Sequence, residues 1–333
     1  MPTVGISLPV ALHQYAIMSA MKRIYLSRQD GVAEVDEVEN GCLVTLVNPT
    51  EKESVQVAER LGIDIDDLRA PLDIEERSRV DETDGYVLIV VDIPVREMGD
   101  GSEGYTTIPL GIVLTDEAIV TTCLQETPLV SDFVKGRVRD FSTHKATRFV
   151  FQLLGRIASS YLTNLRSIDA RSVEIERRLH KSMRNKELID MLGLEKSLVY
   201  FSTSLRSNQR VLDRLLRLGS IEKDPDDEDL LEDVIEENRQ AIEMTEIYNN
   251  VLSGTMDAFA SVISNNQNMV MKVLALITIL MSIPTMVFSA YGMNVASEGM
   301  PFAGSFWGFA IIIGFSFMIS AAVTLIFFVK KWF

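Results

Sequence analysis

One helical face near the C-terminal end of the chain carries polar side chains at a regular spacing. Four hydroxyl residues follow one another at steps of three or four in an otherwise apolar segment: Thr278, Ser282, Thr285 and Ser289. At about 3.6 residues per turn, this spacing places all four on one side of a helix. Hydroxyls in apolar helices commonly bond to carbonyls of their own helix or pack against a second helix. Four hydroxyl residues on one face, followed by Asn294 in a turn, favour a water-filled path lined by several copies of the helix. The periodicity alone leaves both interpretations open.

The helix that must position this face is long. The same spacing extends the face toward the N-terminus through Asp257, Ala260, Ser264, Asn268, Met271 and Leu274. From Asp229 onward no proline occurs before Pro284, and a heptad-like seam with several polar members runs from Leu231 to Val270. A helix of about 60 residues would be about 90 Å long. One small domain cannot cover such a helix, so we expect the chain to self-associate.

Two segments near the C-terminus are long and apolar enough to cross a membrane. Residues 273–290 and 302–329 contain 18 and 28 residues without a charge. A helix rises about 1.5 Å per residue and needs roughly 20 residues to cross a hydrocarbon core of about 30 Å. A pair of buried core helices would need a large soluble shell, and only four residues follow the second segment. We therefore expect two membrane spans in a lipid bilayer.

The charge distribution gives the expected orientation. Of the net charge of −15, residues 1–269 carry −17, because the remaining charged residues are Lys272, Glu298, Lys330 and Lys331. The lysines lie before the first span and after the second. The positive-inside rule then predicts a multi-pass protein of the plasma (inner) membrane with both termini in the cytoplasm. Residues 1–20 have no basic region typical of a signal peptide, which agrees with an N-terminus in the cytoplasm.

The N-terminal part mixes strand and helix signals up to about residue 143. Residues 42–48, 86–94, 106–114 and 118–124 are short apolar runs typical of strands, and Thr-Asp-Glu between the last two suggests a hairpin. Residues 53–73 read as one or two helices that end near Pro71. These signals predict a small α/β domain.

A helical pattern follows from Lys145 to about Leu218. Its apolar stripe falls at steps of three and four: Val150, Leu154, Ile157, Tyr161, Leu165 and Ile168. Residues 221–238 then carry ten acids and one lysine. We interpret them as the tip of a helical hairpin, where Pro225 breaks the first helix and an Asp caps the next. So acidic a surface also collects divalent cations.

Several function classes find no support in the sequence. It contains no G-x-x-x-x-G-K-[ST] loop, no H-E-x-x-H and no paired C-x-x-C, and its three histidines are scattered. Cys42 and Cys123 are too few and too far apart for a disulfide framework or a zinc site. We therefore expect no enzyme, no cofactor and no nucleic-acid partner, and we interpret the two cysteines as reduced core thiols.

Three motifs together carry a resemblance to a known family. Tyr-Gly-Met-Asn at residues 291–294 follows the first span, Met-Lys-Val-Leu at 271–274 precedes it, and Lys-Lys-Trp at 330–332 follows the second. In this arrangement the chain resembles the CorA family of magnesium channels over nearly all residues after 21. The resemblance implies an α/β cytoplasmic head, a long α-helical stalk and two C-terminal transmembrane helices in a homopentamer. The first spans of the five subunits would line one pore.

Individual roles follow from the same resemblance. Asn294 would supply a ring of amide oxygens at the outer mouth, with Gly292 forming the turn and Met293 packing beside it. Met271 and Leu274 would form a hydrophobic constriction, with Asn268 as a polar ring just below it. Asp257 would belong to cytoplasmic divalent sites between subunits, so that Mg²⁺ is both the transported and the regulatory ion. The pore lining is then Asn268, Met271, Leu274, Thr278, Ser282, Thr285 and Ser289.

The chain departs from the family pattern at three places. Met-Pro-Phe-Ala at 300–303 replaces the usual Met-Pro-Glu-Leu, which leaves Glu298 as the only acid of the loop. Ser282 stands where a second Met often narrows the pore. Ala70 stands where an Asp of the head often faces the stalk Asp, so Asp67 or Asp73 substitutes for it as a metal ligand or the site is lost.

The predicted organisation has seven parts: an N-terminal extension (1–20), an α/β domain (21–144), a helical stalk (145–269), a first span (270–291), an outer loop (292–302), a second span (303–329) and a basic tail (330–333). Two alternatives remain at this point. The first is a Co²⁺, Ni²⁺ or Zn²⁺ carrier on the same scaffold. The lack of pore-facing His or Cys argues against Zn²⁺, because softer ligands suit that ion. The second is a two-span sensor or scaffold, which would need neither the hydroxyl face nor Asn294.

Overall fold

The chain folds into two compact units in a computed structural model. The structure describes residues 20–29, 31–98, 103–182, 185–219, 221, 223–294, 299–302 and 305–330. The first unit is Met1–Thr255 and the second is Met256–Phe333, so the division falls within the predicted stalk. The predicted extension at 1–20 lies outside the described residues except for Ala20, as do Glu298, Ala303, Lys331 and Trp332.

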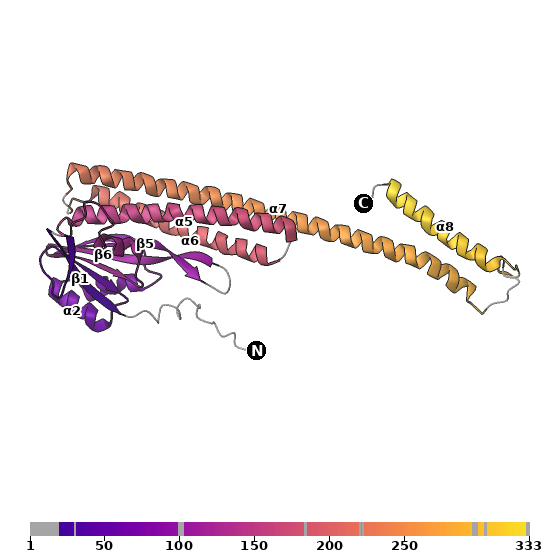
Figure 1. The fold of residues 1–333 in the computed structure, drawn as a ribbon, viewed down its shortest axis with the longest axis horizontal. Coiled ribbons are helices and arrows are strands. Elements are labelled where there is room, and N and C mark those ends of the chain that lie inside the picture. Colours follow the sequence, from indigo (N-terminus) through magenta and orange to yellow (C-terminus); the bar gives the residue numbers. More distant parts are fainter. Residues whose placement is uncertain are drawn as a thin grey trace. The chain divides into compact units, whose positions relative to one another are not determined.

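A seven-stranded sheet organises the first unit (Figure 1). Its order is β2-β1-β3-β7-β6-β5-β4, and only the β3–β7 pair is parallel. The strands are β1 (Met21–Arg28), β2 (Gly31–Val35), β3 (Cys42–Val47), β4 (Arg79–Thr83), β5 (Tyr86–Met98), β6 (Glu103–Thr115) and β7 (Ala118–Cys123).

Helices cover both faces of this sheet. Helices α2 (Glu51–Leu61) and α3 (Ile65–Arg69) pack on one face, where Val57 and Leu68 join strand residues such as Val44 in the core. The 3-10 helix η1 (Ala70–Leu72) follows α3. Helices α4 (Pro128–Val134), α5 (Ala146–Ser182) and α6 (Asn185–Arg217) belong to the other layer, and α5 and α6 pack on β5 and β6. The sheet of the predicted α/β head (21–144) thus has its own helices α2 and α3 on one face, whereas helices α5 and α6 of the predicted stalk cover the other.

The strands that were predicted are those with continuous apolar runs. They correspond to β3, β5, β6 and β7, and β6 and β7 form the predicted hairpin. The sequence reading missed β1, β2 and β4. In β1 only Ile24 and Leu26 are buried, and β4 has the sequence RVDET. Half-buried or acidic strands give a weaker apolar signal than buried ones.

Two predictions about the helices differ in outcome. All six residues of the α5 stripe are buried, from Val150 to Ile168, as expected. The prediction that Pro225 breaks the first helix was wrong, because α6 already ends at Arg217 and Pro225 is the first residue of α7 (Pro225–Tyr291). Proline is well tolerated there, since the first-turn N–H groups of a helix have no internal partner. The acidic residues from 225 to 238 are thus helical, and only the segment before Pro225 forms the hairpin tip.

Part of the α7 seam is covered within the chain itself. Leu231, Asn238, Thr245 and Leu252 are at most 3 % exposed. The amide nitrogen of Asn238 donates to the Leu205 carbonyl of α6 at 3.2 Å. Helices α5 and α6 therefore cover these seam residues in the N-terminal half of α7. The expectation was that the long helix needs other subunits to cover it.

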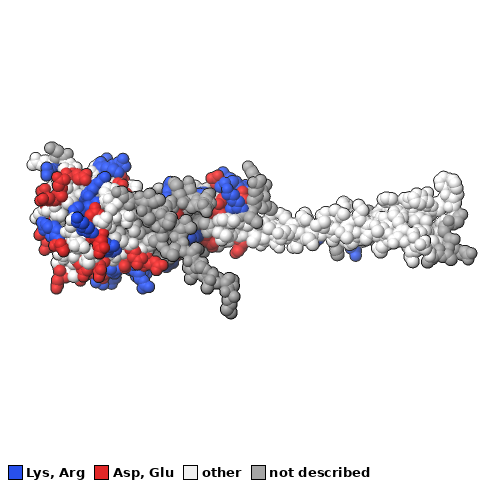
Figure 2. Space-filling view, turned by 90° about the horizontal axis from the view of Figure 1, so that it is seen from below, with Lys and Arg blue, Asp and Glu red and all other residues white. Residues whose placement is uncertain are grey.

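The second unit consists of the end of α7 and α8 (Gly308–Val329). Both α7 and α8 contain a segment long and apolar enough to cross a membrane. Figure 2 shows Asp, Glu, Lys and Arg over the surface of the first unit, whereas the coloured charged residues are nearly absent from the face of the second unit that is in view. Such a surface suits a hydrocarbon solvent and not water.

Candidate functional site

The predicted polar face lies on the part of α7 that belongs to the second unit. Its members are Asn268, Met271, Leu274, Thr278, Ser282, Thr285 and Ser289, and all except the half-buried Ser282 are exposed. Met271 is 64 % and Leu274 is 53 % exposed. Because a single chain does not cover this face, it is available to other copies of the chain or to solvent.

Three hydroxyls of the face donate their hydrogens to the helix itself. Thr278 Oγ1 donates to the Leu274 carbonyl at 2.9 Å, and Thr285 Oγ1 donates to Met281 at 2.8 Å. Ser282 Oγ donates to Ile279 at 2.8 Å. A hydroxyl has one donor hydrogen and two acceptor lone pairs. The three hydroxyl oxygens therefore still have free lone pairs and can accept hydrogen bonds from groups that face the helix.

The Gly-Met-Asn turn follows directly after α7. The Gly292 N–H donates to the Phe288 carbonyl at 2.9 Å and closes the helix. Gly292 is not among the described residues with positive φ, but a Cβ added there would lie 3.3 Å from the Phe288 oxygen. Met293 and Asn294 are exposed. The amide of Asn294 thus lies beyond the helix, at the end of the polar face.

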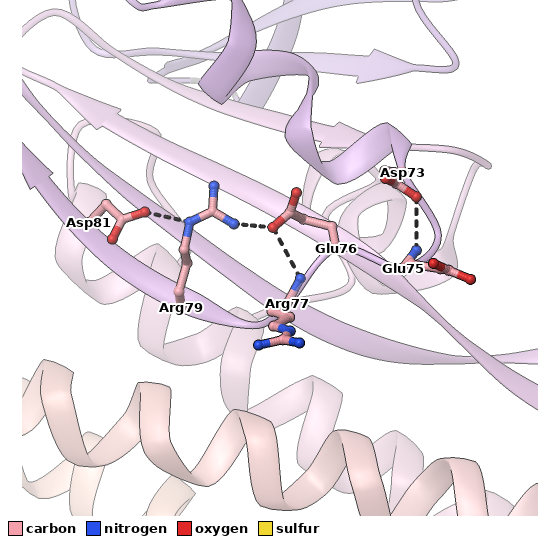
Figure 3. Close-up of polar contacts among 6 residues, drawn as sticks. All are labelled: Asp73, Glu75, Glu76, Arg77, Arg79 and Asp81. Atoms are coloured by element: carbon pink, nitrogen blue, oxygen red, sulfur yellow. Dashed lines mark hydrogen bonds and ion pairs between the residues drawn. The ribbon is translucent and has the colours of Figure 1, made fainter.

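The segment that carries Asp73 is rich in paired charges. Figure 3 shows the Arg79 guanidinium between the carboxylates of Glu76 and Asp81, and both contacts are hydrogen-bonded ion pairs. Asp73 lies apart from this group; its carboxylate accepts the Glu75 N–H at 3.0 Å (Figure 3). Asp73 is also exposed. Glu76 and Asp81 are neutralised by an arginine, whereas the Asp73 carboxylate makes only a local contact with the main chain.

Asp67 has a different environment. It is half-buried in α3, and its carboxylate accepts the Tyr86 hydroxyl at 2.6 Å. Burial of the ring, together with this hydrogen bond, raises the pKa of Tyr86 above its ordinary value. The Asp67 carboxylate thus links α3 to the start of β5, which is a structural role.

The remaining predicted metal ligand, Asp257, is exposed on α7 and belongs to the second unit. Ala70 lies at the junction of α3 and η1, where it has helical backbone angles. Within the part of the chain that the structure describes, no three His, Cys, Asp or Glu side chains gather to hold a metal ion. Asp67 and Asp73 belong to the first unit, whereas Asp257 belongs to the second.

Sequence reasoning missed polar contacts at three places in these regions. They are the Asp67–Tyr86 bond, the Arg79 ion pairs, and a bond of 3.0 Å from the Tyr291 hydroxyl to the Pro301 carbonyl. No spacing in the sequence signals the first or the third, because each joins residues from different elements. The close spacing of acids and arginines from Glu75 to Asp81 could have indicated the second.

Comparison with known proteins gives a consistent result. A protein-family model described as CorA-like Mg²⁺ transporter protein matches residues 40–331. A cobalt/magnesium transport protein CorA of Methanocaldococcus jannaschii is 29 % identical over 296 residues, which cover 86 % of this chain and 89 % of the relative. A protein of the same name from Thermotoga maritima is 23 % identical over 281 residues, covering 83 % and 79 %.

A solved structure agrees with the fold. The complete structure of the CorA magnesium transporter from M. jannaschii has a TM-score of 0.78 at 24 % identity, and the match covers 93 % of this chain and 98 % of that chain. This likeness extends over the head, the long helix and both apolar helices.

Proposed function

The chain belongs to the CorA-like Mg²⁺ transporter family, and we propose that it forms a channel for hydrated Mg²⁺ whose pore is lined by α7. The observation that carries this proposal is the exposed polar face of α7, which runs through an apolar helix to Asn294. Polar residues at membrane depth are costly and mark ion pathways. One helix cannot enclose a pore, so the proposal requires several copies, and the family resemblance favours five.

The acceptor character of the face suits a hydrated cation. Mg²⁺ dehydrates reluctantly and usually keeps several waters. Waters bound to a cation point their hydrogens outward and therefore need acceptors. The oxygens of Thr278, Ser282 and Thr285 still offer lone pairs after bonding to the helix. A ring of neutral Asn294 amides would accept hydrogen bonds from the water shell without holding the ion too tightly to leave.

The same helix supplies a gate. Rings of Met271 and Leu274 would form a hydrophobic constriction that dewets when narrow and so blocks a hydrated ion. Asn268 would add a polar ring on the cytoplasmic side. Since the lysines flank the two apolar segments, Gly292–Asn294 would face the outside and both termini the cytoplasm of a plasma-membrane protein.

Regulation by cytoplasmic Mg²⁺ would use Asp257 and an acid of a neighbouring subunit. Of the two predicted partners, the contacts favour Asp73, because Asp67 already accepts the Tyr86 hydroxyl whereas Asp73 is exposed. Mg²⁺ bound between subunits would stabilise the closed state, and falling Mg²⁺ would shift the population toward the open one. The acidic first unit would also concentrate cations, screened over about 8 Å at physiological salt.

Cobalt is the second candidate ion. The names of the M. jannaschii and T. maritima relatives pair cobalt with magnesium. A hydrated Co²⁺ ion would meet the same acceptors as hydrated Mg²⁺. Neither His nor Cys belongs to the polar face, which gives no support to zinc as the main ion.

The test is ion flux in liposomes that contain the purified full chain. We expect saturable Mg²⁺ influx, weaker Co²⁺ influx and little Zn²⁺ influx, and a particle mass of five chains of 37.3 kDa each in detergent. Liposomes that carry none of these ions above the protein-free background would contradict the proposed function. Faster Co²⁺ than Mg²⁺ influx would favour the second candidate.

A further inference from the structure

A side-chain hydrogen bond joins the two ends of the loop that contains Asn294. Tyr291 is the last residue of α7, and its hydroxyl donates to the main-chain carbonyl of Pro301 at 3.0 Å. The Gly292 N–H makes the last helical hydrogen bond of α7, to the Phe288 carbonyl, and Met293 and Asn294 follow beyond the helix. The bond therefore closes the loop at the point where the proposed filter begins.

The acceptor carbonyl is itself held by a tight turn before α8. Phe302 follows Pro301 with a left-handed φ of 64°. Its carbonyl accepts the Ser305 N–H at 3.1 Å, and the Ser305 carbonyl accepts the Gly308 N–H at 2.9 Å. A Cβ added at Gly308 would lie 2.2 Å from the Phe302 oxygen. Only a glycine fits at position 308, so the turn that presents Pro301 to Tyr291 depends on the absence of a Cβ there.

We infer that Tyr291 is a positioning residue for the filter, an inference that rests on the proposed function. Asn294 can hold a hydrated ion only if its amide stays at one position, and ordering a free loop costs conformational entropy. Pinning both loop ends reduces the freedom that the segment has to lose on binding an ion. The phenol hydroxyl, and not only its ring, is needed for this. A tyrosine at this depth could otherwise serve merely as an aromatic anchor in the membrane interface, a role that phenylalanine largely keeps.

The test is Tyr291→Phe in liposomes, with the Mg²⁺ concentration at half-maximal flux, the maximal flux and competition by Ca²⁺ as readouts. We expect half-saturation to rise about fivefold and Ca²⁺ to compete better, while assembly stays intact and maximal flux changes less than twofold. Fivefold is the net effect of about one hydrogen bond. The matched control is Tyr161→Phe, which removes a hydroxyl that donates to the Asp92 carbonyl at 3.1 Å in the first unit. This control should leave half-saturation unchanged.

A second pair of variants tests the other end of the bond. Gly308→Ala should raise half-saturation because the new methyl group displaces the turn, whereas Gly314→Ala on the same helix meets nothing within 4 Å and should not. Combining Gly308→Ala with Tyr291→Phe should add little, because both break the same link.

The outcomes separate the inference from the function on which it rests. Wild-type flux with an unchanged half-saturation in both Tyr291→Phe and Gly308→Ala overturns the inference alone. A loss of flux in Tyr291→Phe that only parallels a loss of assembled protein assigns the hydroxyl to stability and also overturns it. Absence of Mg²⁺ flux in the wild-type protein overturns the proposed function together with the inference.

Discussion

Helices α5 and α7 are both long and periodic, yet their apolar residues lie in opposite environments. On α5 the stripe residues Val150, Tyr161 and Leu165 are fully buried against the rest of the first unit. On the second-unit part of α7, Met271 and Met281 are 64 % and 70 % exposed. Periodicity alone therefore does not reveal what covers a helix. The near absence of charged residues beyond 270 distinguishes the two, because long segments without charges are typical of helices that cross a membrane.

The largest expected effect contrasts a buried side chain with one that the single chain leaves exposed. Phe201 of α6 is fully buried and packs against the rings of Tyr105 and Tyr161, with centroids 5.7 and 5.0 Å away. Phe201→Ala should lower the free energy of unfolding by about 3–5 kcal/mol. Met281→Ala, at an exposed position, should change it by less than about 0.5 kcal/mol. Thermal unfolding in detergent measures both, and equal effects would contradict the contrast.

The next effect concerns which side of α7 matters. Met271→Asp should raise basal Mg²⁺ flux at high internal Mg²⁺ by at least about tenfold, because a charged ring would keep the constriction wet. Met269→Asp is the matched control, since Met269 is 55 % exposed but lies off the polar face. Flux assays in liposomes compare them. A hydrophobic gate at this level would be ruled out by an unchanged leak in Met271→Asp or an equal leak in the control.

A smaller effect tests whether the acids of the first unit act on the second. Asp257→Ala and Asp73→Ala should each raise severalfold the internal Mg²⁺ concentration that closes the channel, and the double variant should add little. Asp67→Asn should instead lower stability, because it weakens the contact with Tyr86. If Ala70 marks a lost site, neither alanine variant will move the closing concentration. The regulatory part of the proposal would then fail and the pore would remain.

The smallest effect isolates the hydroxyls of the polar face. Thr285 and Thr324 make the same bond, each donating at 2.8 Å to the carbonyl four residues earlier, but only Thr285 belongs to the polar face. Thr285→Val should reduce Mg²⁺ flux about two- to threefold by removing an acceptor, a loss of roughly half a kcal/mol. Thr324→Val should have no effect on flux. Equal flux in both variants would mean that these hydroxyls serve only their own helix.

The fold and the site were predictable to different degrees. Continuous apolar strands such as β5 and long periodic helices were readable, because each carries its signal within its own residues. Strand β1 was not, since only Ile24 and Leu26 of its eight residues are buried and its apolar signal is correspondingly weak. The polar face of α7 follows from spacing alone. The bonds from Tyr86 to Asp67 and from Tyr291 to Pro301 could not be predicted, because they depend on turns that bring separate elements together.

The most direct test of the account is Mg²⁺ influx through Asn294→Ala in liposomes, measured beside the wild-type protein and the control Asn250→Ala. Asn250 is an exposed asparagine of the first unit, so its loss changes the same chemical group away from the pore. The account predicts that Asn294→Ala assembles normally but loses selective Mg²⁺ influx, whereas Asn250→Ala transports like the wild type. Assembled Asn294→Ala protein that carried Mg²⁺ at the wild-type rate and selectivity would contradict the assignment of the filter.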